Sequence, residues 1–120
     1  MKKPREVKIS IRTVEKATIV DLQGDIDIGT APVFRSQLFK ALPNASRLAL
    51  NMSGIRYIDS AGIATMVEVR LKARELDKDF ALFGCSSKVY AVLKLTRLVG
   101  FFRIVDSEEQ AVAGDATSHG

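Results

Sequence analysis

The sequence has 120 residues, of which 47% are hydrophobic and 27% charged, as is typical of one globular domain with its own core. No apolar run reaches the roughly 20 residues of a membrane-spanning helix, and the N-terminus lacks a signal-peptide core. We therefore expect a cytoplasmic protein without membrane insertion. A single cysteine, Cys85, and a single histidine, His119, exclude an internal disulfide and the usual four-ligand zinc site.

The formal net charge of +4 raises the question of nucleic-acid binding. Lys and Arg are scattered through the middle of the chain among acidic residues, so we expect no direct nucleic-acid contact. One stretch, residues 80–105, is free of acids and carries Lys88, Lys94, Arg97 and Arg103. It could face an acidic partner or simply form a solvated surface.

The first third of the chain predicts a hairpin and a loop. Residues 7–12 alternate apolar and polar side chains, and residues 17–23 are rich in β-branched and apolar types, so both predict strands. The mostly polar residues 13–16 between them predict a turn. Gly24 is expected to end the second strand, and residues 25–28 are then expected to form an acidic loop.

The middle of the chain predicts two helices around a strand. Thr30 and Pro32 are typical of a helix start, and helical spacing of apolar residues continues to about Leu42. Residues 47–52 predict a central strand, residues 53–60 a loop, and residues 61–76 the longest helix. Its expected buried stripe is Ile63, Met66, Val67 and Leu71, with an exposed ion pair between Glu68 and Lys72.

The last third predicts a strand at residues 80–83, a helix capped by Ser86 or Ser87, and a strand at residues 101–105. Residues 107–110 match a capping box that opens a short terminal helix. We expect one domain over residues 1–113 and a disordered tail over residues 114–120.

Two opening strands followed by alternating helices and strands predict an α/β sandwich, with a mixed four- to five-stranded sheet flanked by about four helices. The connections that follow parallel strands meet at one edge of such a sheet. We therefore expect the loop at Asp25 to lie near the turn at Ser60, and we take this neighbourhood as the candidate functional site.

Ser60 lies where a loop enters a helix, so free N–H groups and the positive end of the helix dipole are expected to accommodate a phosphate there. Phosphorylation would add about −1.5 to −2 charge. Together with Asp25, Asp27 and Asp59 it would make the surface strongly acidic. The ordinary alternative is that Asp59 or Ser60 only caps the helix.

Catalytic interpretations of the same residues lack partners. A serine nucleophile on a strand-to-helix turn expects a glycine at position 58, where Ile58 stands, and a base, for which only His119 in the polar tail is available. Paired Asp25 and Asp27 are typical of a solvated loop. Without a second Cys or a nearby His, Cys85 is interpreted as a small buried residue. We expect no enzyme activity, metal or cofactor.

Three segments in register resemble the STAS family, named for sulfate transporters and anti-sigma factor antagonists. Residues 24–32 resemble its glycine-acidic loop and first helix, residues 57–63 its signature turn, and residues 92–109 its last helix, loop and strand. The resemblance covers residues 5 to 113. Two positions depart from the family pattern: Ala61 stands where many members carry a second serine, and Arg97 where a glycine is common.

The resemblance implies a bacterial partner switch controlled by Ser60. The unmodified domain would bind an anti-sigma factor serine kinase and release a sigma factor for transcription, the kinase would phosphorylate Ser60, and a phosphatase would reset it. The implied partner-binding residues are Asp25, Asp27, Asp59, Ser60, Ala61, Gly62 and Ile63. The family also includes accessory subunits that brace the ATPase of a lipid-transporting ABC complex, which is the alternative function. A nucleotide-binding sensor has no motif in its support.

Overall fold

The structure, a computed structural model, describes residues 5–114. Its strands are β1 (Val7–Val14), β2 (Ala17–Ile26), β3 (Arg47–Ile58), β4 (Asp79–Phe83) and β5 (Arg103–Val105). Its helices are α1 (Ala31–Ala41), which a 3-10 turn (η1, Leu42–Asn44) extends, α2 (Ser60–Glu75), α3 (Ser87–Leu95) and α4 (Glu108–Ala113). The predicted order of strands and helices is confirmed.

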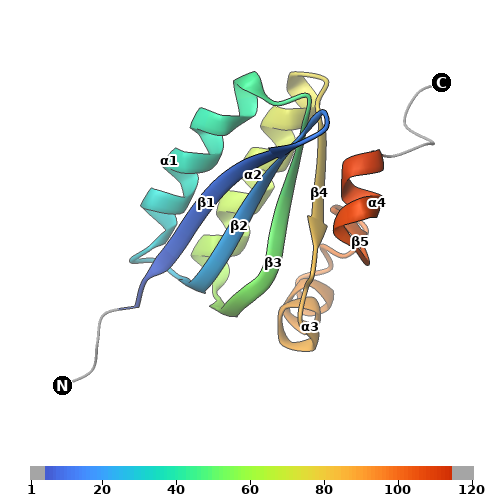
Figure 1. Cartoon of the computed structure of the whole chain (residues 1–120). Coiled ribbons are helices and arrows are strands. Elements are labelled where there is room, and N and C mark those ends of the chain that lie inside the picture. The colour runs from blue at the N-terminus through green and yellow to red at the C-terminus, as the bar shows by residue number, and fades with distance from the viewer. Residues whose placement is uncertain (1–4, 115–120) are drawn as a thin grey trace.

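The strands form one sheet in the order β1-β2-β3-β4-β5. β1 and β2 pair antiparallel as a hairpin, whereas the pairs β2-β3, β3-β4 and β4-β5 are parallel. Parallel neighbours need crossover connections, which α1, α2 and α3 supply (Figure 1). The predicted α/β fold with a mixed sheet is confirmed.

Helices cover the two faces of the sheet unequally. α1, α2 and α3 bury the larger core against one face, with Phe34, Met66 and Leu93 among its fully buried side chains. α4 alone covers part of the other face, where Ala111 and Val112 pack on Ala49 and Phe83 (Figure 1). Within residues 5–114 no helix combines the length and apolar character needed to cross a membrane.

β3 is twice as long as the sequence predicted, since residues 53–58 continue the strand that was expected to end at Met52. The pairing with β2 shifts register on either side of Gln23 and Gly24, and Gly54 lies opposite Gln23. A Cβ atom at position 54 would lie 2.5 Å from the carbonyl oxygen of Leu22, so glycine permits this close pairing. The Ser53-Gly54 sequence marks an irregular strand here, not a turn.

Two details of the long helix α2 differ from the prediction. Leu71 is half exposed, and the buried stripe continues instead through Val69 and Ala73. The expected pair between Glu68 and Lys72 does not form. Glu68 accepts from Arg35 of α1 at 3.0 Å, because α1 packs beside α2 and presents a guanidinium on the same surface.

The C-terminal elements are close to the prediction. Ser86 caps α3 by accepting from Val89 N, and Ser107 caps α4 by accepting from Gln110 N. β5 begins at Arg103 and not at Phe101, because Phe101 and Phe102 lie in the preceding turn, where their rings pack edge to face. Of the tail predicted to be disordered, residues 115–120 lie outside the described residues.

Candidate functional site

Asp59 is the N-cap of α2. Its backbone is extended, and its Oδ1 accepts hydrogen bonds from Ala61 N at 2.9 Å and Gly62 N at 3.2 Å. Two of the N–H groups that a helix start leaves free are therefore satisfied by one carboxylate, which also sits at the positive end of the helix dipole. Between the two capping candidates that the sequence left open, the cap is Asp59.

Asp59 also joins the start of α2 to the end of β2. Its Oδ2 accepts from Ile28 N at 3.2 Å, and its own N–H donates to Ile26 O at 3.1 Å. The loop after β2 and the turn after β3 are thus bonded to each other, although about thirty residues separate them in the sequence. The expectation that these two segments are neighbours is confirmed.

Ser60 is the first residue of α2 and is exposed. Among the hydrogen bonds of residues 5–114, none involves its hydroxyl group. Because Asp59 performs the capping, the Ser60 side chain has no structural role that the described contacts identify. Its hydroxyl group is therefore accessible at the first position of the helix.

Gly62 and Ile63 pack the start of α2 against the sheet. Both are buried, and a Cβ atom at position 62 would lie 2.7 Å from Cγ2 of Ile26 and 2.8 Å from Cγ1 of Ile58. The helix can approach the ends of β2 and β3 this closely only with glycine here. Of the residues expected to bind a partner, these two are therefore packing residues, while Ala61 is partly exposed.

The segment predicted to be an acidic loop, residues 25–28, is partly strand, since β2 continues to Ile26. Thr30 fixes the short connection between β2 and α1. Its hydroxyl group donates to Asp25 O at 2.8 Å and accepts from Asp27 N at 2.9 Å, and so it does not cap α1 as the sequence predicted. Asp27 Oδ1 accepts from Gly29 N and from Thr30 N. The loop is held rigid by its own polar groups.

Arginine side chains face the two aspartates of this segment. Asp25, only 8% exposed, is paired with Arg56 at 3.5 Å, and Asp27 lies 3.8 Å from Nε of Arg5. The Arg5 guanidinium also stacks over the Tyr57 ring, 4.2 Å from its centroid. In the unmodified protein these aspartates do not form an acidic surface, because Asp25 and Asp27 are paired with cations and Asp59 is bonded to backbone N–H groups. The strongly acidic surface expected after phosphorylation stays a prediction.

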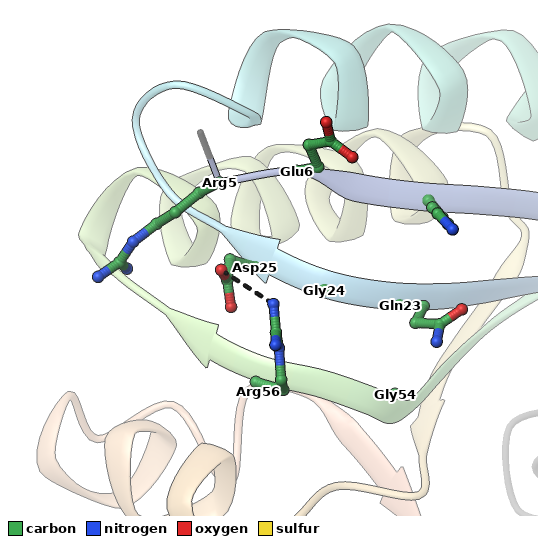
Figure 2. A pocket seen from close by; sticks show the side chains of 8 residues that line it. Arg5, Glu6, Gln23, Gly24, Asp25, Gly54 and Arg56 are labelled. Atoms are coloured by element: carbon green, nitrogen blue, oxygen red, sulfur yellow. Dashed lines mark hydrogen bonds and ion pairs between the residues drawn. The ribbon is translucent and has the colours of Figure 1, made fainter. Parts of the chain in front are cut away.

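A polar cavity of about 710 Å³ lies beside this turn, on the sheet face that α4 leaves uncovered. Figure 2 shows Arg56 reaching from β3 across to Asp25 at the end of β2, with Arg5 on the adjoining segment before β1. The cavity is lined by Arg5, Glu6, Lys8, Gln23, Gly24, Asp25, Gly54 and Arg56. It extends the site along the sheet with charges of both signs.

Two exposed apolar side chains flank the Asp59-Ser60 turn, and the sequence had not singled them out. Ile28 is 80% exposed and its N–H is bonded to Asp59, while Tyr57 is 44% exposed and stands two residues before it. Large apolar groups at a rigid polar site are typical anchors for a protein partner. The sequence did contain one signal, since Ile28 stands between Asp27 and Gly29. A large apolar side chain is unusual in a loop that is only solvated.

The structure gives no support for a catalytic role of Cys85 or His119. Burial raises the pKa of the Cys85 thiol to about 11, which keeps it protonated and unreactive at neutral pH. Cys85 was interpreted as a small buried residue, and in the structure it is partly buried and packs against the larger core. His119, the one candidate base for Ser60, lies outside the described residues.

These features define an α/β domain with an exposed serine at the start of its longest helix. The family model described as the STAS domain matches residues 8–111. The chain belongs to the STAS family.

Relatives of known name agree with this assignment. The anti-sigma-B factor antagonist of Listeria monocytogenes is 25% identical over 114 residues, which cover 92% of this chain and 100% of that protein. Among solved structures, an anti-sigma factor antagonist from Mycobacterium paratuberculosis superposes with a TM-score of 0.81 at 17% identity, covering 89% of this chain and 92% of that one. The Bacillus protein SpoIIAA in its phosphorylated form superposes at 0.68 with 15% identity, covering 88% and 97%.

Proposed function

We propose that this protein is an anti-sigma factor antagonist, a non-enzymatic cytoplasmic binding protein that docks on an anti-sigma factor serine kinase and is released when Ser60 is phosphorylated. The observation that carries the proposal is the free, exposed hydroxyl of Ser60 beside a cap supplied by Asp59. The names of the relatives supply the class of partner.

The unmodified turn suits protein docking. Ile28 and Tyr57 offer apolar surface next to Ser60, and the paired charges of Asp27 with Arg5 keep the surroundings close to neutral. The backbone of both loops is fixed by hydrogen bonds, so little ordering entropy is lost on binding. Asp25, Gly62 and Ile63 act by holding this surface in place. Asp27, Asp59 and Ser60 are its polar contacts, and Ala61 adds a partly exposed methyl group.

Phosphorylation would change this surface more than the fold. The N–H groups of Ala61 and Gly62 are already bonded to Asp59, so they are not free to receive a phosphate on Ser60. The added charge, about −1.5 to −2, would instead stand beside the Asp59 carboxylate and face the partner. Like charges and an unpaired phosphate in a docked interface would favour dissociation. The kinase would in this way release its own ligand, and a phosphatase would restore binding.

The test is an affinity purification from cells of the source organism with the Ser60→Ala and Ser60→Asp variants, the bound proteins being identified by mass spectrometry. We expect an anti-sigma factor kinase to be retained by the alanine variant and lost with the aspartate variant. The matched control is Ser87→Asp, since Ser87 is also exposed, is also the first residue of a helix, and follows the capping Ser86.

Three results would contradict the proposal. Equal retention of the kinase by the Ser60→Asp and native forms would show that charge at Ser60 does not control binding. Recovery of a transport ATPase with all variants would identify the chain as an accessory subunit of a lipid-transporting ABC complex. Loss of the kinase from the Ser87→Asp variant to the same extent would mean that an added negative charge weakens binding wherever it is placed.

A further inference from the structure

At the end of the sheet opposite Ser60, the fold gathers cations that are far apart in the sequence. A cavity of about 400 Å³ there is lined by Lys16, Arg47, Arg70, Arg74, Lys78 and Arg103, with Asp77 and Asp79 as the only acids of that lining. Six cations against two acids leave a net charge of +4 around one cavity. We call this region the basic pole.

Few of these cations are neutralised. Arg103 is paired with Asp79 at 3.2 Å. Lys78 donates to the carbonyl oxygens of Pro43 and Ala45, and Arg47 donates to that of Val112. Carbonyl groups orient a cation but carry no formal charge, so the positive charge of Lys78 and Arg47 stays uncompensated.

Three further cations have no bonded partner in the part of the chain that the structure describes. No side-chain hydrogen bond or ion pair among residues 5–114 includes Lys16, Arg70 or Arg74, and the Arg70 guanidinium group lies over the Phe101 ring, whose centroid is 5.9 Å away. The Nε–H of Arg70 is buried and lacks an acceptor. A buried unsatisfied donor is unusual in a folded protein and points to a missing acceptor.

The charges also oppose one another. Burial lowers the pKa of Arg70, and the neighbouring charge of Arg74 lowers it further, while Asp79 acts in the opposite direction. An anion placed between these side chains would relieve the repulsion and supply the acceptor that Arg70 lacks.

We propose that the basic pole binds a phosphate-bearing small molecule, with Arg70 and Arg74 donating to its phosphate oxygens and Arg47, Lys78 and Lys16 surrounding it. Guanidinium groups match phosphate geometry with paired hydrogen bonds. The cavity volume falls in the range of small-ligand sites, and the cations surround one hollow and do not form a stripe as long nucleic acids require.

The basic pole is separate from the Ser60 turn. Arg47 begins β3 and Ser60 follows its end, and the strand between them has 12 residues, which is roughly 35 Å at full extension. Figure 1 shows the β1-β2 hairpin tip and the α2-β4 connection at one end of the sheet, and the start of α2 at the other. The inference does not depend on the proposed function.

Calorimetric titration of the full chain with inorganic pyrophosphate tests the proposal. We expect saturable binding to one site, weakened about tenfold or more in the double variant Arg70→Gln and Arg74→Gln, because two charge-assisted donors are lost. The control double variant, Lys88→Gln and Lys94→Gln, removes the same charge from exposed residues of α3 and should bind as the native chain does. Thermal unfolding of each variant verifies that it is folded.

Additional measurements locate the site and identify the source of the phosphate. Amide signals that shift with pyrophosphate should belong to residues 46–47, 70–80 and 103, and not to residues 57–63. Phosphatidylglycerol vesicles that pyrophosphate displaces would assign the phosphate to a lipid headgroup, and absence of vesicle binding would assign it to a soluble compound. In both cases the site is the same.

Three results would overturn the inference. One is no saturable pyrophosphate binding by the native chain. Another is an equal loss of affinity in the control double variant, which would indicate diffuse attraction by net charge. The third is binding of duplex DNA that is tighter than pyrophosphate binding and is lost in the double variant Arg70→Gln and Arg74→Gln, which would make the basic pole a surface for a polymer.

Discussion

At the start of α2, adjacent side chains have different environments. Asp59 uses both carboxylate oxygens on backbone N–H groups, whereas the neighbouring Ser60 hydroxyl is exposed without a bonded partner among the described residues. Placing the structural bond on one residue leaves the next free for modification. Chemistry at Ser60 can therefore change the surface while Asp59 keeps the turn intact.

Gly62 is the residue on which this turn depends for its packing. We expect Gly62→Ala to destabilise the protein by about 1–2 kcal/mol, because overpacking against Ile26 and Ile58 outweighs the better helix propensity of alanine. Urea unfolding measures the change. Gly100→Ala is the control, since a Cβ atom there meets nothing within 4 Å. If both substitutions left stability unchanged, the turn would be looser than the structure indicates.

Residues of the site differ in how far the sequence revealed them. Local rules restricted the helix cap to Asp59 or Ser60, since a cap acts within three residues of itself. The structure assigns the cap to Asp59 and leaves Ser60 exposed. The pairing of Asp25 with Arg56 and the stacking of Arg5 on Tyr57 depend on which strands are neighbours and in what register. Local pattern does not supply that information, so an acidic loop was expected where the charges are in fact paired.

Among the secondary-structure elements, α4 is joined to β1 and β2 by the side chain of Arg12. Arg12 of β1 bonds to Asp21 of β2 at 2.6 Å and also to Glu108 of α4. Hydrogen bonds from Arg12 lower the pKa of Asp21 and that of Glu108 below their usual values. This contact connects three elements across the sheet surface.

The lowered pKa values give the contact a pH dependence. A carboxylate whose folded pKa lies below its unfolded value, near about 4, stabilises the protein above that pH, and the contribution is lost as the pH falls through the folded pKa. We expect Arg12→Gln to be less stable than the native protein at pH 7 and the difference to shrink towards pH 3. Urea unfolding at both pH values measures it.

The control for this prediction is Lys8→Gln, which removes a positive charge from the same strand outside the contacts of α4. It should have little effect at either pH. If the stability lost by Arg12→Gln were the same at pH 7 and pH 3, Arg12 would act through packing of its side chain and not through its charge.

The length of β3 is a feature that the local sequence pattern did not predict. Alternating and buried patterns identified every strand, but Ser53-Gly54 is typical of a turn, and the strand was expected to end before it. It continues because Ile55 and Ile58 pack into the core and pair with the end of β2 beyond the irregularity. Long-range pairing overrode the local turn signal.

On the scale of the whole molecule, the sheet separates two chemically different ends. Ser60 and the loops that Asp59 joins lie at the carboxyl ends of the parallel strands, and the basic pole lies at their amino ends. The cations of the basic pole come from positions 16 to 103, and the sequence showed them only as scattered Lys and Arg. Folding brings these cations around one cavity, and their spacing in the sequence does not indicate this arrangement.

We propose that Ser60 is the control point of a partner switch, and phosphorylation with purified components provides a direct test. The protein is incubated with the kinase recovered in the affinity purification and with ATP, the modified residue is located by tandem mass spectrometry, and binding of the product is measured. We expect one phosphate, on Ser60, none on the Ser60→Ala variant, and weakened binding of the modified form. Phosphate on another residue, or a phosphorylated form that binds as tightly as before, would contradict it.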